Sequence, residues 1–160
     1  MRPSVISKLL SSNDTGETGG HQAGILIPKG GGILDFFPVL DSRQKNPRSA
    51  LLFTDEAGQC WKFNFIYYNN RFFGGTRNEY RLTGMTSYLR QNNLKPGDTV
   101  ILARSEDDNL TIRYQRSSVA AEGRSKLVNT LQDRNTEMPE KVAEGKPKFV
   151  VTGTWKVVKY

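Results

Sequence analysis

The segment from residue 49 to residue 68, SALLFTDEAGQCWKFNFIYY, constrains the fold more than any other part of the chain. Its middle, residues 55–58, favours a tight turn between two strands. Successive side chains of a strand point to opposite faces, and after this turn the aromatic residues all fall on one face. That face carries Trp61, Phe63, Phe65 and Tyr67, while the other carries Lys62 and Asn64. The pattern predicts a β-hairpin.

Short strand-like runs recur along the rest of the chain, and helical segments are few. We expect strands at residues 5–10, 24–28, 76–82, 99–104, 110–116 and 148–160. We also expect a helical turn within 33–40, a helix at 85–93 capped by Thr86 or Ser87, a turn at 94–98, a helix at 125–134 and a polar loop at 136–147. The length of 160 residues favours one domain, 1–160. Together these elements predict a mainly β, α+β fold, either a barrel or a sandwich.

The charge of the chain narrows the class of partner. Lys and Arg number 23 against 16 Asp and Glu, which gives a formal net charge of +7. Such a balance favours an anionic partner, of which nucleic acid is the commonest, and we expect no membrane association. Cys60 is the only cysteine, so no internal disulfide can form and a cytoplasmic setting is expected. Because it lies in a core-like strand, we expect Cys60 to be a buried apolar residue.

The stretch NDTGETGGHQAGILIPK, residues 13–29, combines glycines with short polar side chains. Glycine allows positive φ and close approach of a backbone to a ligand. A phosphate-binding loop would need a Lys-Ser/Thr pair at the start of a helix, whereas His21 and Gln22 here precede a strand. His21 is the only histidine and cannot form a zinc site with a distant cysteine. A solvent loop remains the alternative to a binding loop.

A second stretch, YYNNRFFGGTRNEYRL at residues 67–82, contains a row of charges. If residues 76–82 are extended, then Arg77, Glu79 and Arg81 share one face. Same-face residues lie about 6.6 Å apart, roughly two base-pair steps. Arginine donates to guanine O6 and N7 and glutamate accepts from the cytosine amino group, so the row is suited to reading G·C pairs. The alternative is an outward strand face on which Glu79 only pairs with the arginines.

These two stretches closely resemble the DNA-recognition arms of the N-terminal domain of EcoRII-type restriction endonucleases, which carry NDTG-x-TGGHQ-x-G and YYN-x-R-x-FG-x-TRNE-x-R strings. The resemblance covers about residues 5–150. It implies a DNA-binding pseudobarrel of the plant B-three type with two protruding arms, an N-arm at 13–29 and a C-arm at 68–81. It also implies that double-stranded DNA is gripped in the major groove at a CCWGG-type site, with one domain for each site.

The resemblance further implies which residues touch DNA. The candidates for base contact are Asp14, Thr15, Thr18, His21, Gln22, Arg77, Asn78, Glu79 and Arg81. The candidates for backbone contact are Asn13, Lys29, Lys62, Asn70, Arg71, Thr76 and Arg90. We expect Phe72 and Phe73 to anchor the base of the C-arm. Some members have an aromatic residue in place of Leu26 and lysines in place of Gly75 and Tyr80, which implies weaker or relocated phosphate contacts here.

We expect DNA cleavage to be carried out by a separate domain. Nuclease chemistry needs carboxylates and a lysine around Mg²⁺. Glu144, Gly145 and Lys146 match the residue types of such a motif. Pro147 follows immediately, so the strand on which the motif should lie is missing. We therefore expect a non-catalytic domain without a cofactor, joined in cis to a Mg²⁺-dependent nuclease domain beyond residue 160 in a prokaryotic cytoplasm. The rival hypotheses are a self-contained nuclease, a B-three-like or AbrB-like transcription regulator that does not cut, and a single-strand or RNA binder of the OB kind.

Overall fold

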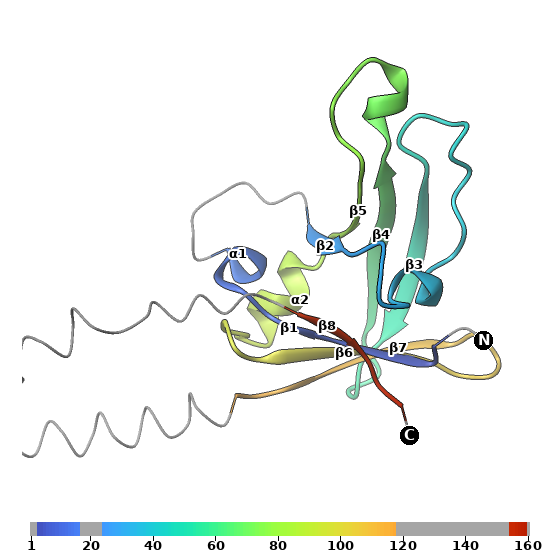
Figure 1. Ribbon diagram of the computed structural model, residues 1–160. Helices are drawn as coiled ribbons and strands as arrows, with labels where there is room; N and C mark the ends of the chain where they lie inside the picture. Colours follow the sequence, from blue (N-terminus) through green and yellow to red (C-terminus); the bar gives the residue numbers. More distant parts are fainter. Residues whose placement is uncertain (1–2, 17–23, 118–153, 160) are drawn as a thin grey trace, which may run out of the picture.

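A computed structural model describes residues 3–16, 24–117 and 154–159 of the chain. Its strands form one sheet of eight, in the order β2-β5-β4-β3-β7-β6-β1-β8. All neighbouring strands are antiparallel except β3 and β7, which are parallel (Figure 1). The strands are β1 (Val5–Leu9), β2 (Ile25–Ile27), β3 (Arg48–Thr54), β4 (Cys60–Tyr68), β5 (Glu79–Thr83), β6 (Thr99–Arg104), β7 (Leu110–Gln115) and β8 (Trp155–Val157). The mainly β architecture expected from the sequence is confirmed.

The helical elements of the described residues are short. They are α1 (Ser12–Thr15), the 3-10 helices η1 (Leu34–Phe36) and η2 (Asn70–Phe73), and α2 (Thr86–Gln91). The expectation that Thr86 or Ser87 caps α2 is wrong, because the helix begins after Met85 and has no side-chain cap. Met85 is almost fully buried, so packing against the core sets the start of this helix. The helix expected at 125–134 and the loop expected at 136–147 lie outside the described residues.

The predicted hairpin is formed by β3 and β4, which pair from Arg48 opposite Ile66 to Thr54 opposite Cys60. Asp55 closes the turn, since its carboxylate accepts hydrogen bonds from the backbone N–H groups of Ala57 and Gln59. The indole Nε1 of Trp61 donates to the other carboxylate oxygen at 2.9 Å. Hydrogen bonding to the charged form, chiefly from Trp61, holds the pKa of Asp55 below its ordinary value. The hairpin is thus stabilised by side-chain hydrogen bonds at its turn and by the pairing of its two strands.

The alternation along β4 produces the aromatic half of the core. The four aromatic residues of its inner face are all buried, and Lys62 on the outer face is exposed. Their rings continue onto neighbouring elements: Phe65 stacks on Phe37 at 4.5 Å and Tyr67 stacks on Tyr80 at 4.2 Å between ring centroids. Such contacts add to the stabilisation from buried area. The stack therefore stiffens the hairpin of β4 and β5 from the centre of the core outward.

Cys60 corrects one expectation about this strand, because its side chain is exposed. It immediately precedes Trp61, whose ring points into the core. The same alternation that buries Trp61 therefore turns Cys60 to the outer face. The expected turn at 94–98 is confirmed by a hydrogen bond from the Asp98 N–H to the Lys95 carbonyl. Among the described residues, no helix is long and apolar enough to cross a membrane.

Candidate nucleic-acid interface

The hairpin of β4 and β5 extends beyond the rest of the sheet and carries η2 at its tip (Figure 1). It contains the expected C-arm, residues 68–81. Beside it lies β2, which pairs with β5 through Ile25 to Leu82, Leu26 to Arg81 and Ile27 to Tyr80. α1 and β2 stand at the two ends of the expected N-arm. Thr18, His21 and Gln22, three of its candidate contacts, lie outside the described residues.

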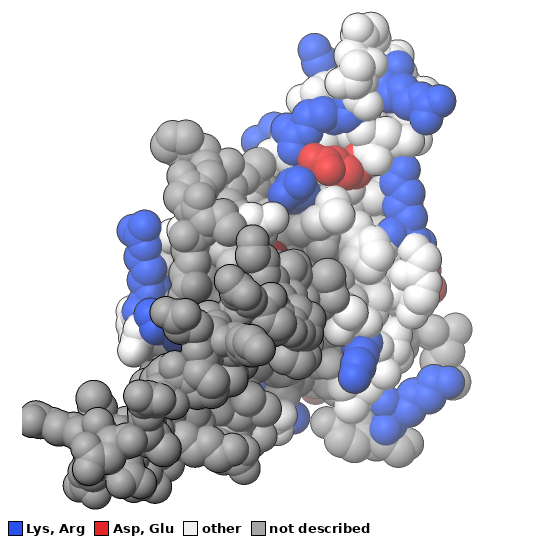
Figure 2. Space-filling view, turned by 60° about the vertical axis from the view of Figure 1, so that its left-hand side comes forward, with Lys and Arg blue, Asp and Glu red and all other residues white. Residues whose placement is uncertain are grey.

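The charged row of the C-arm is assembled as its spacing predicts. Arg77 Nη2 lies 2.7 Å from Glu79 Oε1, and Arg81 Nε lies 3.0 Å from the same oxygen. The side chains of Arg77, Glu79 and Arg81 are 39%, 28% and 24% exposed. The ion pairs of the alternative interpretation are therefore present, and the same three side chains remain open to a partner. Figure 2 shows Lys and Arg gathered around acidic side chains on the projecting part of this face.

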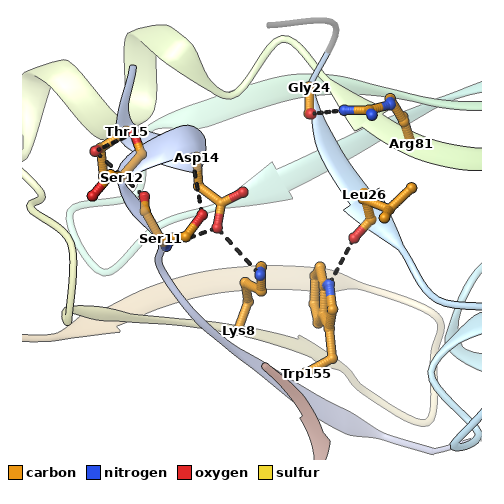
Figure 3. A network of polar contacts seen from close by, with 9 residues as sticks. All are labelled: Lys8, Ser11, Ser12, Asp14, Thr15, Gly24, Leu26, Arg81 and Trp155. Atoms are coloured by element: carbon orange, nitrogen blue, oxygen red, sulfur yellow. Dashed lines mark hydrogen bonds and ion pairs between the residues drawn. The ribbon is translucent and has the colours of Figure 1, made fainter. Parts of the chain in front are cut away.

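Each arginine of the row is oriented by a further contact. The guanidinium carbon of Arg77 lies 3.8 Å from the centroid of the Tyr68 ring, a cation–π geometry. Arg81 donates from Nη1 to the carbonyl oxygen of Gly24 at 2.8 Å and so ties the C-arm to the start of β2 (Figure 3). A guanidinium has five N–H donors, and Arg81 uses three of them, toward Glu79 and Gly24. Within the described part of the chain the other two have no acceptor.

Glu79 is the electrostatic centre of the row. The hydrogen bond from Arg81, supported by that from Arg77, holds the pKa of Glu79 below its usual value even though partial burial raises it. Its Oε1 accepts three hydrogen bonds, whereas Oε2 accepts one long bond of 3.4 Å from Arg81. A carboxylate oxygen offers about two acceptor sites. Glu79 is thus ionised near neutral pH and keeps acceptor capacity on Oε2.

Side chains on the opposite face of the C-arm contact one another and stabilise the arm. The side-chain oxygen of Asn78 accepts hydrogen bonds from Lys29 Nζ and from the Tyr67 hydroxyl, both at 2.7 Å. Lys29 also lies over the Tyr67 ring, 5.8 Å from its centroid. Tyr80 completes this face by stacking on Tyr67, and burial is the main reason that its pKa is raised. The structure therefore brings Asn78 and Lys29 together as partners of one another.

The tip of the C-arm holds the other backbone-contact candidates of this segment. Arg71 and Thr76 are exposed, and the Arg71 N–H donates to the Arg77 carbonyl across the arm. Asn70 packs against Gly75, where an added Cβ would lie 2.8 Å from the Asn70 Cβ. The glycine that replaces a lysine of other members is therefore required by the packing of this tip. Lys62 lies on the outer face of β4, and Arg90 lies on α2, away from the projecting hairpin (Figure 1).

Phe72 and Phe73 do not anchor the arm as expected. Both lie in η2 at the tip, where they are 66% and 43% exposed. The anchoring role belongs to the buried Asn69, which donates to the carbonyls of Ser42 and Gln44 and accepts from the Asn46 N–H. A buried amide that bonds three backbone groups holds the arm to the neighbouring loop. The sequence did not reveal the anchoring role of Asn69, because two adjacent phenylalanines suggest an apolar anchor more strongly than a single asparagine does.

The base of the N-arm is built around Asp14. Its Oδ2 accepts from the Ser11 N–H at 2.9 Å, while the Ser11 hydroxyl accepts from the Asp14 N–H, which forms a capping box at the start of α1 (Figure 3). The same oxygen lies 3.2 Å from Lys8 Nζ, and the two side chains are only 9% and 7% exposed. Asp14 Oδ2 is thus engaged inside the fold, and the side chain is almost fully buried. Thr15 likewise bonds the carbonyls of Ser11 and Ser12, whereas Asn13 is exposed.

Two residues that the sequence did not single out complete this base. Lys8 is buried in β1, beside Asp14 and 6.0 Å from the centroid of the Trp155 ring. Trp155 of β8 donates from Nε1 to the Leu26 carbonyl at 2.8 Å (Figure 3). Since β2 and β8 are the two edges of the sheet, this bond links the edges and closes the pseudobarrel. A lysine within the apolar β1 run and the capping-box spacing of Ser11 and Asp14 are the sequence signals that could have indicated the network.

Comparison with known proteins agrees with this geometry. Residues 3–112 match the family model described as restriction endonuclease EcoRII, N-terminal. The chain is 46% identical to the type II restriction enzyme EcoRII of Escherichia coli over 83 residues, which cover 49% of this chain and 20% of EcoRII. It is 31% identical to auxin response factor 4 of Arabidopsis thaliana over 134 residues, 84% of this chain and 15% of that protein. The chain thus spans about a fifth or less of these relatives.

The fold has a counterpart among solved structures. The protein of the Arabidopsis FUS3-DNA complex superposes with a TM-score of 0.55 and 19% identity, over 70% of this chain and 96% of the FUS3 chain. This similarity confirms the expected plant B-three pseudobarrel. The family match covers most of the described residues, including β1 to β6 and both arm bases. The chain therefore belongs to the family of EcoRII-type restriction endonuclease N-terminal domains.

Proposed function

We propose that this domain binds double-stranded DNA sequence-specifically through the major groove and reads a CCWGG-type short pseudo-palindrome as the recognition domain of a type II restriction endonuclease. The observation that carries the proposal is the oriented row of Arg77, Glu79 and Arg81 on the projecting C-arm. The relatives add support, because one is named a type II restriction enzyme and another protein of the same fold was solved with DNA.

The row has the chemistry of base readout. Each arginine retains N–H donors that fit guanine O6 and N7, and Glu79 Oε2 fits the amino group of cytosine. A carboxylate at the centre of the row would be repelled by phosphates, which favours bases as its partners. The contacts to Tyr68 and to the Gly24 carbonyl hold the arginines before DNA arrives. Less side-chain freedom is then lost on binding.

Charges around the row suit the phosphate backbone. Arg71 and Lys62 are exposed at the tip and on the outer face of β4. Their positive charge would release counterions from DNA and make binding depend on salt. Cleavage, with its Mg²⁺ ions, would then be the task of a nuclease domain in the same protein. In this division the arms select the site and the other domain cuts.

A second candidate is a DNA-binding domain in a protein that does not cleave. It is favoured by relatives of the family that carry the name auxin response factor and not that of a restriction enzyme. The two candidates share the same DNA-binding face. They differ in whether the full-length protein cuts a duplex that contains the bound site in the presence of Mg²⁺.

A selection from random duplexes tests the proposed function. The domain is bound to a random-sequence library, and the enriched duplex is then compared with a scrambled duplex of equal length and base composition. We expect a G·C-rich five-base-pair site, bound at least a thousandfold more tightly than the scrambled duplex near physiological salt. Equal affinity for the two duplexes, or a preference for single strands, would overturn the proposal.

A further inference from the structure

Leu26 is an exposed apolar residue on the face proposed to read DNA. It lies in β2 directly opposite Arg81 of β5. Residues that face each other in an antiparallel pair point to the same side of the sheet. Leu26 therefore lies beside Arg81 on the side of the charged row, and it is 48% exposed.

The backbone fixes Leu26 in this direction. Its neighbours Ile25 and Ile27 are 2% and 1% exposed in the core, so a strand must turn Leu26 outward. The Leu26 carbonyl accepts from Trp155 at the free edge of β2 (Figure 3). Leu26 and Arg81 thus form a pair without backbone hydrogen bonds between them, the type in which opposite Cα atoms are only about 4.5 Å apart.

A leucine held beside a guanine-reading arginine has a specific chemical complement in the major groove. The largest apolar group on the major-groove edges of base pairs is the C5-methyl group of a pyrimidine, which thymine carries. A spacing of about 4.5 Å is comparable to one base-pair step of about 3.4 Å. When Arg81 meets a guanine, Leu26 is therefore within reach of the adjacent base pair.

We propose that Leu26 is a specificity-determining residue that contacts a pyrimidine C5-methyl group in the base pair next to the guanine bound by Arg81. This inference rests on the proposed function and extends it from G·C pairs to the neighbouring position. Leu52 is also exposed, at 60%, and shares the outer face through its partner Lys62 on β4. It has no arginine of the row opposite it, and so it provides a matched control.

The test removes the methyl group without changing the base pairing. Affinities are measured for the selected duplex and for the same duplex with deoxyuridine in place of thymidine, first at all positions and then one at a time. Wild-type protein is expected to lose about fourfold in affinity when the contacted methyl is removed. Leu26→Ala is expected to bind the thymine duplex about fourfold more weakly and to treat the two duplexes alike. Leu26→Met, which keeps the apolar contact, and Leu52→Ala should both keep the preference for thymine.

A third duplex distinguishes the two sources of a C5-methyl group. It carries 5-methylcytosine in place of cytosine beside the same guanine. If the methyl read is that of 5-methylcytosine, affinity rises for wild type and not for Leu26→Ala; if it is that of thymine, only the deoxyuridine exchange has a Leu26-dependent effect. No Leu26-dependent effect of either methyl would overturn the inference. A protein that still prefers its selected duplex over the scrambled one would then retain the proposed function, whereas loss of that preference in wild type would refute both.

Discussion

Arg77 and Arg81 carry the same charge in the same row, yet they differ in what holds them. Arg81 bonds Glu79 and the Gly24 carbonyl, and so it also joins two strands. The side chain of Arg77 donates hydrogen bonds only to Glu79 among the described residues and lies against the Tyr68 ring. Substitution of Arg81 is therefore expected to change both the stability of the fold and the affinity for DNA. Substitution of Arg77 tests base readout more directly.

For Arg77→Ala we expect a loss of about 1–3 kcal/mol on the selected site, relaxed selectivity at one base position and little change in thermal stability. Equilibrium binding to selected and scrambled duplexes measures this. Lys62→Ala is the control, because loss of a phosphate contact should weaken both duplexes alike. If Arg77→Ala weakens both duplexes by the same factor, Arg77 touches the backbone and not a base.

The ionisation of Glu79 gives a prediction about pH. Its pKa in the folded state is lowered, first by the hydrogen bond from Arg81. A carboxylate of this kind stabilises the fold at pH values above its unfolded pKa of about 4.3, and that stabilisation is lost as the pH falls through the lower folded pKa. Thermal denaturation should therefore show Glu79→Gln to be less stable than wild type at pH 7, with the two converging as the pH falls below the folded pKa of Glu79. A difference that stays constant across this range would mean that the charge of Glu79 does not stabilise the row.

At the scale of elements, α1 and β1 are joined by the buried pair of Asp14 and Lys8. Removal of one partner of a buried pair leaves an uncompensated charge. For Asp14→Ala we expect a loss of about 3–5 kcal/mol of unfolding free energy by chemical denaturation, part of it from the capping box. The exposed pair of Asp41 and Arg43 offers the matched control, and Asp41→Ala should change little. If Asp14→Ala instead kept full stability and lost only cognate affinity, its carboxylate would be a DNA contact.

The elements show which parts of the fold the sequence could reveal. The hairpin of β3 and β4 and the charged row follow from a period of two, so a local pattern was enough to predict both. The exposure of Cys60 follows from the same period, and the wrong expectation came from weighing its residue type above its position. Asp14 was a predicted base contact by resemblance, and the structure engages it in a capping box with Ser11 and an ion pair with Lys8. The spacing of Ser11 and Asp14 is the local signature of such a box. Trp155 is separated from Leu26 by 129 residues, and only the closed sheet brings them together.

At the scale of the whole molecule, Arg81 ties the C-arm to the start of β2, and Trp155 ties β2 to β8. If both proposed arms enter the groove, we expect one domain to span a short pseudo-palindrome without a second copy. Native mass spectrometry with a duplex that holds a single selected site should show one protein bound per duplex. A complex dominated by two proteins per site would show that each arm pair reads only half of the site.

The most direct test of DNA reading by the charged row is dimethyl sulfate protection of guanine N7 on the selected duplex. We expect wild-type protein to protect guanines of the site, Arg77→Ala to lose protection at one of them, and Lys62→Ala to leave the pattern unchanged at saturating protein. Binding that leaves every guanine N7 reactive, or an unchanged pattern in the arginine variant, would contradict major-groove readout by this row.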